Sequence, residues 1–204
     1  IQVAEGGMDE ISNILVRLRE LSIQSASDTL GEKERKFADL EFQELSKEIN
    51  RIAQSTSFNG LSLLNGSVSG SLDFQIGNRN DPFNDRISFN PEKATVTGDS
   101  LGINSLTVNN KSDAQSNLQV IDEAIESISG NRANLGALQS RLESTINNLE
   151  IFRESSEAAK SRIRDADIAV ESAGLARANI LSAANTSILA QANSSPATAL
   201  KLVA

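Results

Sequence analysis

A ladder of leucine and isoleucine with a seven-residue period occupies the second half of the chain. Its members are Ile121, Ile128, Leu135, Leu142 and Leu149. A heptad repeat sustained over four intervals is specific for a long helix packed along one seam. Continued to Ile163, this helix would hold about 50 residues and extend roughly 75 Å at about 1.5 Å per residue. A compact globule of 204 residues has no room for it, so we expect a rod.

Two shorter amphipathic helices are predicted ahead of the long one. The first is already under way near residue 1 and places Met8, Ile11, Leu15, Leu18 and Leu21 at spacings of three and four. Residues 28–31, Asp-Thr-Leu-Gly, interrupt it. The second helix, about 32 to 53, carries a coiled-coil-like seam of Ala38, Phe42, Leu45, Ile49 and Ile52.

Residues 56–110 have a different character. Asn-Gly and Ser-Gly turn signals separate short runs, of which Leu72, Phe74 and Ile76 alternate as in a strand. Two further short runs, 87–89 and 94–96, are also interpreted as strands. We therefore predict a mainly α fold: an elongated antiparallel helical rod with a small β-hairpin region between its N- and C-terminal helices.

The predicted domain boundaries follow these changes in pattern. Residues 1–55 form the N-terminal rod helices, and residues 56–110 form the β region at the outer end of the rod. Residues 111–166 form the long C-terminal rod helix, and residues 167–204 form a tail helix.

The tail has almost no charge. From residue 178 to 204, Lys201 is the only charged side chain. Ile180, Leu181, Ala184 and Ile188 share one face, and the opposite face also lacks charge, so this helix is suited to being surrounded. The amides of the segment would be unsatisfied in lipid, which excludes a membrane span and indicates a protein partner.

Composition excludes most catalytic chemistry. The chain has no Cys and no His, so zinc thiolate or imidazole sites, cysteine nucleophiles and Ser-His-Asp triads are impossible. Aromatic content is 3%, all of it Phe, and the net charge of −8 argues against binding nucleic acid. We expect neither a cofactor nor a metal. The stretches Asn80 to Asp85 and Arg164 to Asp167 are interpreted as a turn and a helix break.

One stripe on the first helix combines charged and apolar side chains. Arg17, Glu20, Leu21 and Gln24 lie at spacings of three and four. Spacing alone favours ordinary ion pairing on an exposed helix face.

Several long motifs, in order, resemble the bacterial flagellins. They are EGGMDEISNILVRLRELSIQSAS at residues 5–27, Phe-Asn-Gly at 58–60, RANLGALQSRLESTINNL at 132–149 and SRIRDADIAVESAGLARANILSAANTSILAQAN at 161–193. The resemblance implies a structural subunit of the flagellar filament, not an enzyme, with the family's amino-terminal helix absent before Ile1. A hook-filament junction protein is the alternative within the same superfamily, and a soluble coiled-coil adaptor is a third hypothesis.

The resemblance also implies partners and a location. Flagellins leave the cytoplasm through the flagellar type III export apparatus, guarded by an export chaperone that binds the tail, and they polymerise helically outside the cell for motility. Hook-associated proteins, cap proteins and host Toll-like receptor five are further implied partners. Nucleic acid and membrane are not.

Site residues are carried over motif by motif. Arg17, Glu20, Leu21, Gln24 and Glu48 match the surface that the family uses for the receptor and for protofilament contacts. The tail contacts the chaperone, and later the filament core, through its apolar side chains. We expect these to be Leu175, Ile180, Leu181, Ala184, Ile188, Leu189, Leu200 and Leu202.

Overall fold

The computed structural model describes the backbone of residues 1–203 and the side chains of residues 1–194. The chain divides into two compact units, Ile1–Asn148 and Leu149–Ala204. Four α-helices account for most of the chain: α1 (Gln2–Ala26), α2 (Glu32–Ser55), α3 (Lys111–Arg164) and α4 (Ile168–Val203). The expected mainly helical fold class is confirmed.

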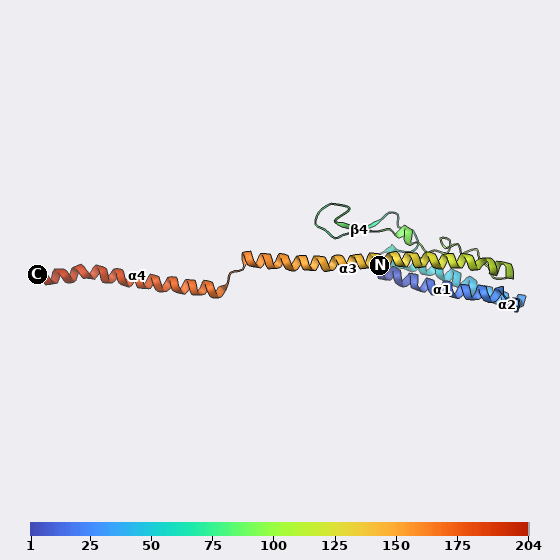
Figure 1. Ribbon diagram of the computed structural model, residues 1–204, viewed down its shortest axis with the longest axis horizontal. Coiled ribbons are helices and arrows are strands. Elements are labelled where there is room, and N and C mark those ends of the chain that lie inside the picture. The colour runs from blue at the N-terminus through green and yellow to red at the C-terminus, as the bar shows by residue number, and fades with distance from the viewer. Residues whose placement is uncertain (204) are drawn as a thin grey trace. The chain divides into compact units, whose positions relative to one another are not determined.

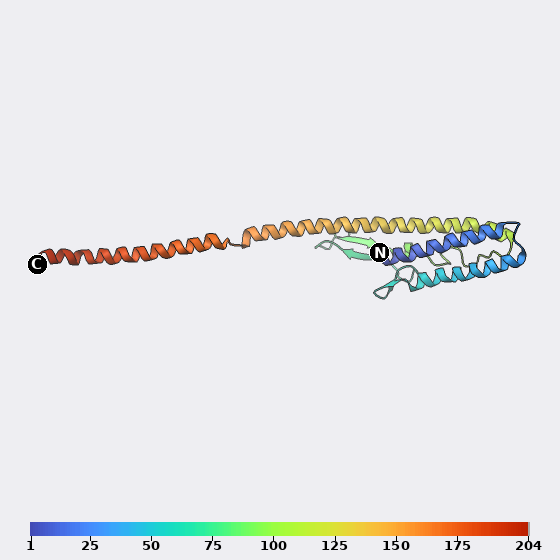
Figure 2. The same ribbon diagram turned by 90° about the horizontal axis from the view of Figure 1, so that it is seen from below.

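The first unit is built on three helices that lie side by side, as both views of the chain show (Figure 1, Figure 2). α1 and α2 form an antiparallel pair, which the ion pair between Arg17 and Glu41 joins across 2.8 Å. α3 runs antiparallel to α1, because Arg19 pairs with Asp122 near one end while Arg132 pairs with Glu5 near the other.

The core of this unit is the seam that the periodicity predicts. Ile121, Ile128 and Leu135 of α3 are buried against Met8, Ile11, Leu15 and Leu18 of α1 and against Phe42 and Ile49 of α2. Phe42 is the one aromatic side chain among the fully buried residues of the described chain. The core is therefore made almost wholly of aliphatic side chains that interlock between helices.

Side-chain hydrogen bonds define where the helices end. The Arg35 guanidinium donates to the carbonyl oxygens of Ser25 and Ser27, each across 2.9 Å, which satisfies acceptors that α1 leaves free at its C-terminus. Asn110 Oδ1 accepts from the backbone N–H of Asp113 in the first turn of α3, the role of an N-cap.

The connection from the β region into α3 is fixed by one carboxylate of α2. Asp39 accepts hydrogen bonds from Thr107 Oγ1 and Val108 N, both at 2.8 Å, and from Asn109 Nδ2 at 3.1 Å. A carboxylate that satisfies three donors of one loop holds the start of α3 against α2.

The β region consists of two separate antiparallel hairpins. β1 (Ser57–Phe58) pairs with β2 (Leu61–Ser62) across Asn59 and Gly60. Both turn residues have positive φ, 52° and 79°, as a tight two-residue hairpin turn requires. β3 (Leu72–Gln75) pairs with β4 (Arg86–Phe89), with Phe74 opposite Ile87.

The prediction of a strand at residues 94–96 is wrong. The structure has a 3-10 helix, η1 (Pro91–Ala94), followed by residues without regular pairing. Pro91 supplies the fixed φ of a first helical position and Asn90 caps the turn by accepting from Glu92 N, so the local sequence favours a helical turn. The short apolar run contributes side chains to the core, where Ala94 and Val96 are both buried.

The second unit comprises the end of α3 and all of α4. Residues 165–167 separate the two helices, as the Arg-Asp-Ala-Asp pattern indicates. Asp167 Oδ1 accepts from the N–H of Ala169 at 2.9 Å and so caps the start of α4. In the described chain, no helix has the combination of length and apolar character needed to cross a bilayer.

Candidate functional surfaces

The Arg17 surface of α1 is an ion-paired cluster. Arg17 Nη1 donates to Glu20 Oε2 at 3.0 Å, and its Nε donates to Glu41 Oε1 of α2 at 2.8 Å. These bonds, with that to Glu41 contributing most, raise the pKa of Arg17 above its ordinary value. The cluster is exposed and presents a guanidinium fixed by two carboxylates from two helices.

Gln24 and Leu21, two other predicted members of this surface, differ in their exposure to solvent. Gln24 is exposed on α1, one turn beyond Glu20. Leu21 is 2% exposed and packs in the core, because it occupies the same seam as Leu18. Leu21 therefore supports the surface from beneath and presents almost no area to a partner.

Glu48 lies on α2, apart from the Arg17 cluster. It is seven residues beyond Glu41, which is two helical turns or roughly 10 Å along the axis. Its carboxylate accepts from Arg51 Nη2 at 2.6 Å and Nε at 2.7 Å, and this pairing lowers the pKa of Glu48. The structure thus brings Arg17 and Glu20 together, and places Glu48 on the same helix face as Glu41 but not in contact with Arg17.

Glu41 is the member of the cluster that sequence reasoning missed. The sequence signal for Glu41 is the register between the antiparallel helices α1 and α2. Leu18 and Phe42 both lie in the core, and their neighbours Arg17 and Glu41 form an ion pair across the two helices. Comparing the charged positions of the two helices with each other, and not only those along α1, would have predicted the pairing of Arg17 with Glu41.

The predicted tail surface is exposed along its whole described length. Leu175, Ile180, Leu181, Ile188 and Leu189 are between 56% and 68% exposed, and Ala184 is exposed as well. The side chains of Leu200 and Leu202 lie outside the described residues. The described part of α4 therefore offers apolar groups around much of its circumference.

The end of the heptad ladder is exposed too. Leu135 is buried, Leu142 is half-buried, and Leu149 is 46% exposed. In the first unit, Ile1 to Val3 line a hollow with Leu142 and Ile146 of α3. Leu142 and Ile146 therefore remain partly accessible at this hollow.

The first unit belongs to the class of long-helix bundles that carry a small β region on one side. Residues 1–69 match the bacterial flagellin N-terminal helical region, and residues 118–203 match the bacterial flagellin C-terminal helical region. Together these two matches take in most of the chain.

Two relatives and one solved structure show the same similarity to flagellins. The flagellin of Halalkalibacterium halodurans is 38% identical over 203 residues, which cover 100% of this chain and 73% of that relative. The flagellin of Bacillus subtilis is 37% identical over 236 residues, covering 100% of this chain and 76% of the relative. The crystal structure of Bacillus cereus flagellin matches with a TM-score of 0.63 at 28% identity, over 72% of this chain and 82% of that one.

The chain belongs to the bacterial flagellin family. It is a structural subunit of the flagellar filament, and membership implies polymerisation with other flagellin subunits. None of these similarities favours the hook-filament junction alternative.

Proposed function

We propose that the second unit is the assembly surface of this filament subunit, and that α4 packs against other subunits in the filament core. The observation that carries this proposal is the exposure of every described side chain from residue 146 to residue 194. An apolar helix without cover is stable in water only when another surface encloses it.

The size of the apolar contribution supports assembly through this helix. Covering side chains such as Ile180, Leu181 and Ile188, which are more than half exposed, contributes roughly 1–2 kcal/mol each before the entropic cost of association. A head-to-tail contact repeated by a rotation that does not close yields an open helical filament. We propose this geometry for the polymer.

The same helix needs cover before polymerisation. Exposed apolar surface of this extent promotes aggregation in the cytoplasm. We propose that an export chaperone encloses Leu175 to Leu202 until the flagellar type III apparatus exports the chain to the outside of the cell. Hook-associated and cap proteins would then meet the subunit at the two ends of the growing filament.

We also propose a division of work along the chain. Residues 1–55 and 111–166 supply the rod helices, residues 56–110 form the outer β region, and residues 167–204 form the core and chaperone segment. The ion-paired surface of α1 and α2 would make contacts between protofilaments.

Toll-like receptor five is the proposed host partner of that ion-paired surface. Arg17, Glu20 and Gln24 offer exposed charged and amide groups, Glu48 offers a part-exposed carboxylate, and Leu21 holds α1 in place beneath the α1 residues. Arg17→Ala should lower potency in a receptor-reporter assay, while Lys47→Ala, which removes an exposed cation of α2 that pairs with Glu44 of the same helix, should not. Unchanged potency for Arg17→Ala would remove the receptor proposal and leave the filament assignment intact.

Assembly is tested by seeding. The full-length protein is mixed with short filament fragments and observed by electron microscopy. We expect long helical filaments from the unmodified chain and few or none from Ile180→Asp, which places a charge in the assembly surface. Phe83→Asp is the matched control, because it places the same charge at a side chain of the β region that is 90% exposed and lies outside the second unit. A soluble coiled-coil adaptor would give no filaments with any of these chains.

A further inference from the structure

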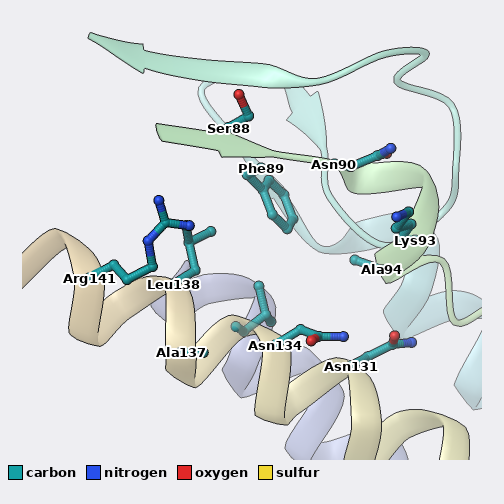
Figure 3. A pocket seen from close by; sticks show the side chains of 11 residues that line it. Ser88, Phe89, Asn90, Lys93, Ala94, Asn131, Asn134, Ala137, Leu138 and Arg141 are labelled. Atoms are coloured by element: carbon teal, nitrogen blue, oxygen red, sulfur yellow. The ribbon is translucent and has the colours of Figure 1, made fainter. Parts of the chain in front are cut away.

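A hollow of about 400 Å³ lies between the β region and α3, within the first unit. β4 and η1 form one wall and α3 forms the other (Figure 3). Its polar lining includes Asn90 and Lys93 from the β side and Asn131, Asn134 and Arg141 from α3. We call this hollow the hairpin cleft.

The hairpin cleft is cationic in an acidic protein. Lys93 and Arg141 line it, and no Asp or Glu does, although the chain carries a net charge of −8. Neither cation forms an ion pair or side-chain hydrogen bond within the described residues. Asp73 lies beside the cleft, where it accepts from Oγ of the lining residue Ser88 and lies 4.0 Å from Arg86 Nη1, while Glu92 accepts from Gly70 N.

A second hollow of about 420 Å³ continues from the first and shares Arg141. It adds Arg86, which hydrogen-bonds to Gln75 and Asn80 and pairs with Asp73 at 4.0 Å, and no carboxylate is among its lining residues. Three cations therefore border the space between the β3–β4 hairpin and α3, and two of them, Lys93 and Arg141, have no ion pair within the described residues.

The remaining lining groups suit a hydroxylated ligand. The side-chain amides of Asn131 and Asn134 make no hydrogen bond to the described protein, so their donors and acceptors are open to a ligand. The Phe89 ring projects from β4 into the hollow, between Arg141 toward one end and Lys93 toward the other (Figure 3). The face of such a ring carries partial negative charge and attracts the C–H groups of a sugar ring.

We propose that the hairpin cleft binds a short acidic saccharide of the uronic-acid type. A carboxylate would pair with Arg141, a second carboxylate with Lys93, and the hydroxyls between them with the open amides while one ring lies on Phe89. A volume of about 400 Å³ is within the range of small-ligand sites. Filament assembly does not require this site, so the inference goes beyond the proposed function.

The test is a titration of the full chain followed by amide chemical shifts. Digalacturonate is the probe, with galacturonate, a neutral digalactoside and inorganic phosphate as comparison ligands. We expect digalacturonate to bind more tightly than galacturonate, to shift the signals of residues 88–94 and 131–141, and to weaken as salt is raised, because exposed charges are screened. Equal binding of the neutral disaccharide, or of phosphate, would overturn the assignment.

Variants assign the charges. Arg141→Gln and Lys93→Gln should each weaken digalacturonate binding about tenfold, since each removes a charge-assisted hydrogen bond. Asn134→Asp should weaken it as well by adding a repelling carboxylate. Lys160→Gln, an exposed cation of α3 outside the cleft, should leave it unchanged. Unaltered affinity in both cation variants, with circular dichroism showing an intact fold, would contradict the proposal.

Discussion

Arg132 of α3 donates from Nε to Glu5 Oε1 of α1 across 2.9 Å, over a separation of 127 residues in the chain. Its Nη2 lies 3.0 Å from Asp9 Oδ1, one turn further along α1. The hydrogen bond to Glu5, with the charges of both carboxylates, raises the pKa of Arg132. One guanidinium that engages two successive turns fixes the register of α1 on α3.

Arg132→Ala should therefore lower the free energy of unfolding of the first unit. The expected loss is about 1 kcal/mol, because the pair is part-exposed and solvent screens it. Urea unfolding followed by circular dichroism measures it. Arg153→Ala is the matched control on the same helix, since the Arg153 pair with Glu157 is long, 3.9 Å, and exposed. Equal losses in both variants would show that the register contact has no special role.

The aliphatic core should depend strongly on its single fully buried aromatic side chain. Phe42→Ala is expected to cost about 3–5 kcal/mol, the usual loss for truncating a buried Phe. Phe37 lies on the same helix but is 70% exposed, so Phe37→Ala should change stability by less than about 0.5 kcal/mol. The midpoints of thermal or urea unfolding of the two variants measure this difference. Similar midpoints for Phe42→Ala and Phe37→Ala would contradict the placement of α2.

The ion pair of Asp28 with Lys111 should make stability depend on acid pH. The hydrogen bond from Lys111 Nζ, 2.8 Å long, lowers the pKa of Asp28 below its ordinary value of 3.8. A carboxyl whose pKa is lower in the folded state stabilises the fold above its unfolded pKa, and the contribution is lost as pH falls through the folded value.

Asp28→Asn should accordingly be less stable than the unmodified chain near neutral pH and equal to it at strongly acid pH. Urea midpoints measured across this pH range test the claim. Glu150→Gln, which removes an exposed carboxylate that has no ion pair within the described residues, should show no such convergence. A constant difference between Asp28→Asn and the unmodified chain at every pH would refute the linkage.

Gly77 should tolerate no side chain. A Cβ at this position would overlap the carboxylate of Asp85, which is buried and accepts a hydrogen bond from Asp81 N. Gly77→Ala should cost about 1–3 kcal/mol and speed hydrogen exchange in residues 72–89. Gly136→Ala, on α3 with no atom within 4 Å of the added group, should instead stabilise the chain by up to about 1 kcal/mol.

The helices were predictable because their signals are local and repeated. The heptad positions Ile121, Ile128 and Leu135 are buried as expected, and the break at residues 165–167 is where the charged pattern indicates it. The prediction of a strand at residues 94–96 was wrong because Asn90 and Pro91 together start a helical turn. The preference of these two residues for the start of a helix outweighs the strand preference of the short apolar run.

The candidate surfaces were harder to predict than the helices. The position of Leu21 in the core and the role of Glu41 both depend on how α1 meets α2, which spacing along one helix does not contain. The hairpin cleft gave no signal in the sequence, because Lys93 and Arg141 are 48 positions apart and line the same hollow only through the packing of η1 near α3.

Hydrogen exchange of α4 tests the central claim most directly. In the monomer, the exposed helix of residues 168–194 should exchange quickly, because no buried contact slows its opening. In filaments of the full-length protein, the same amides should be strongly protected, while the core of α1 and α3 around Leu18 and Ile121 changes little. Filaments in which residues 168–194 exchange as fast as in the monomer would contradict the account.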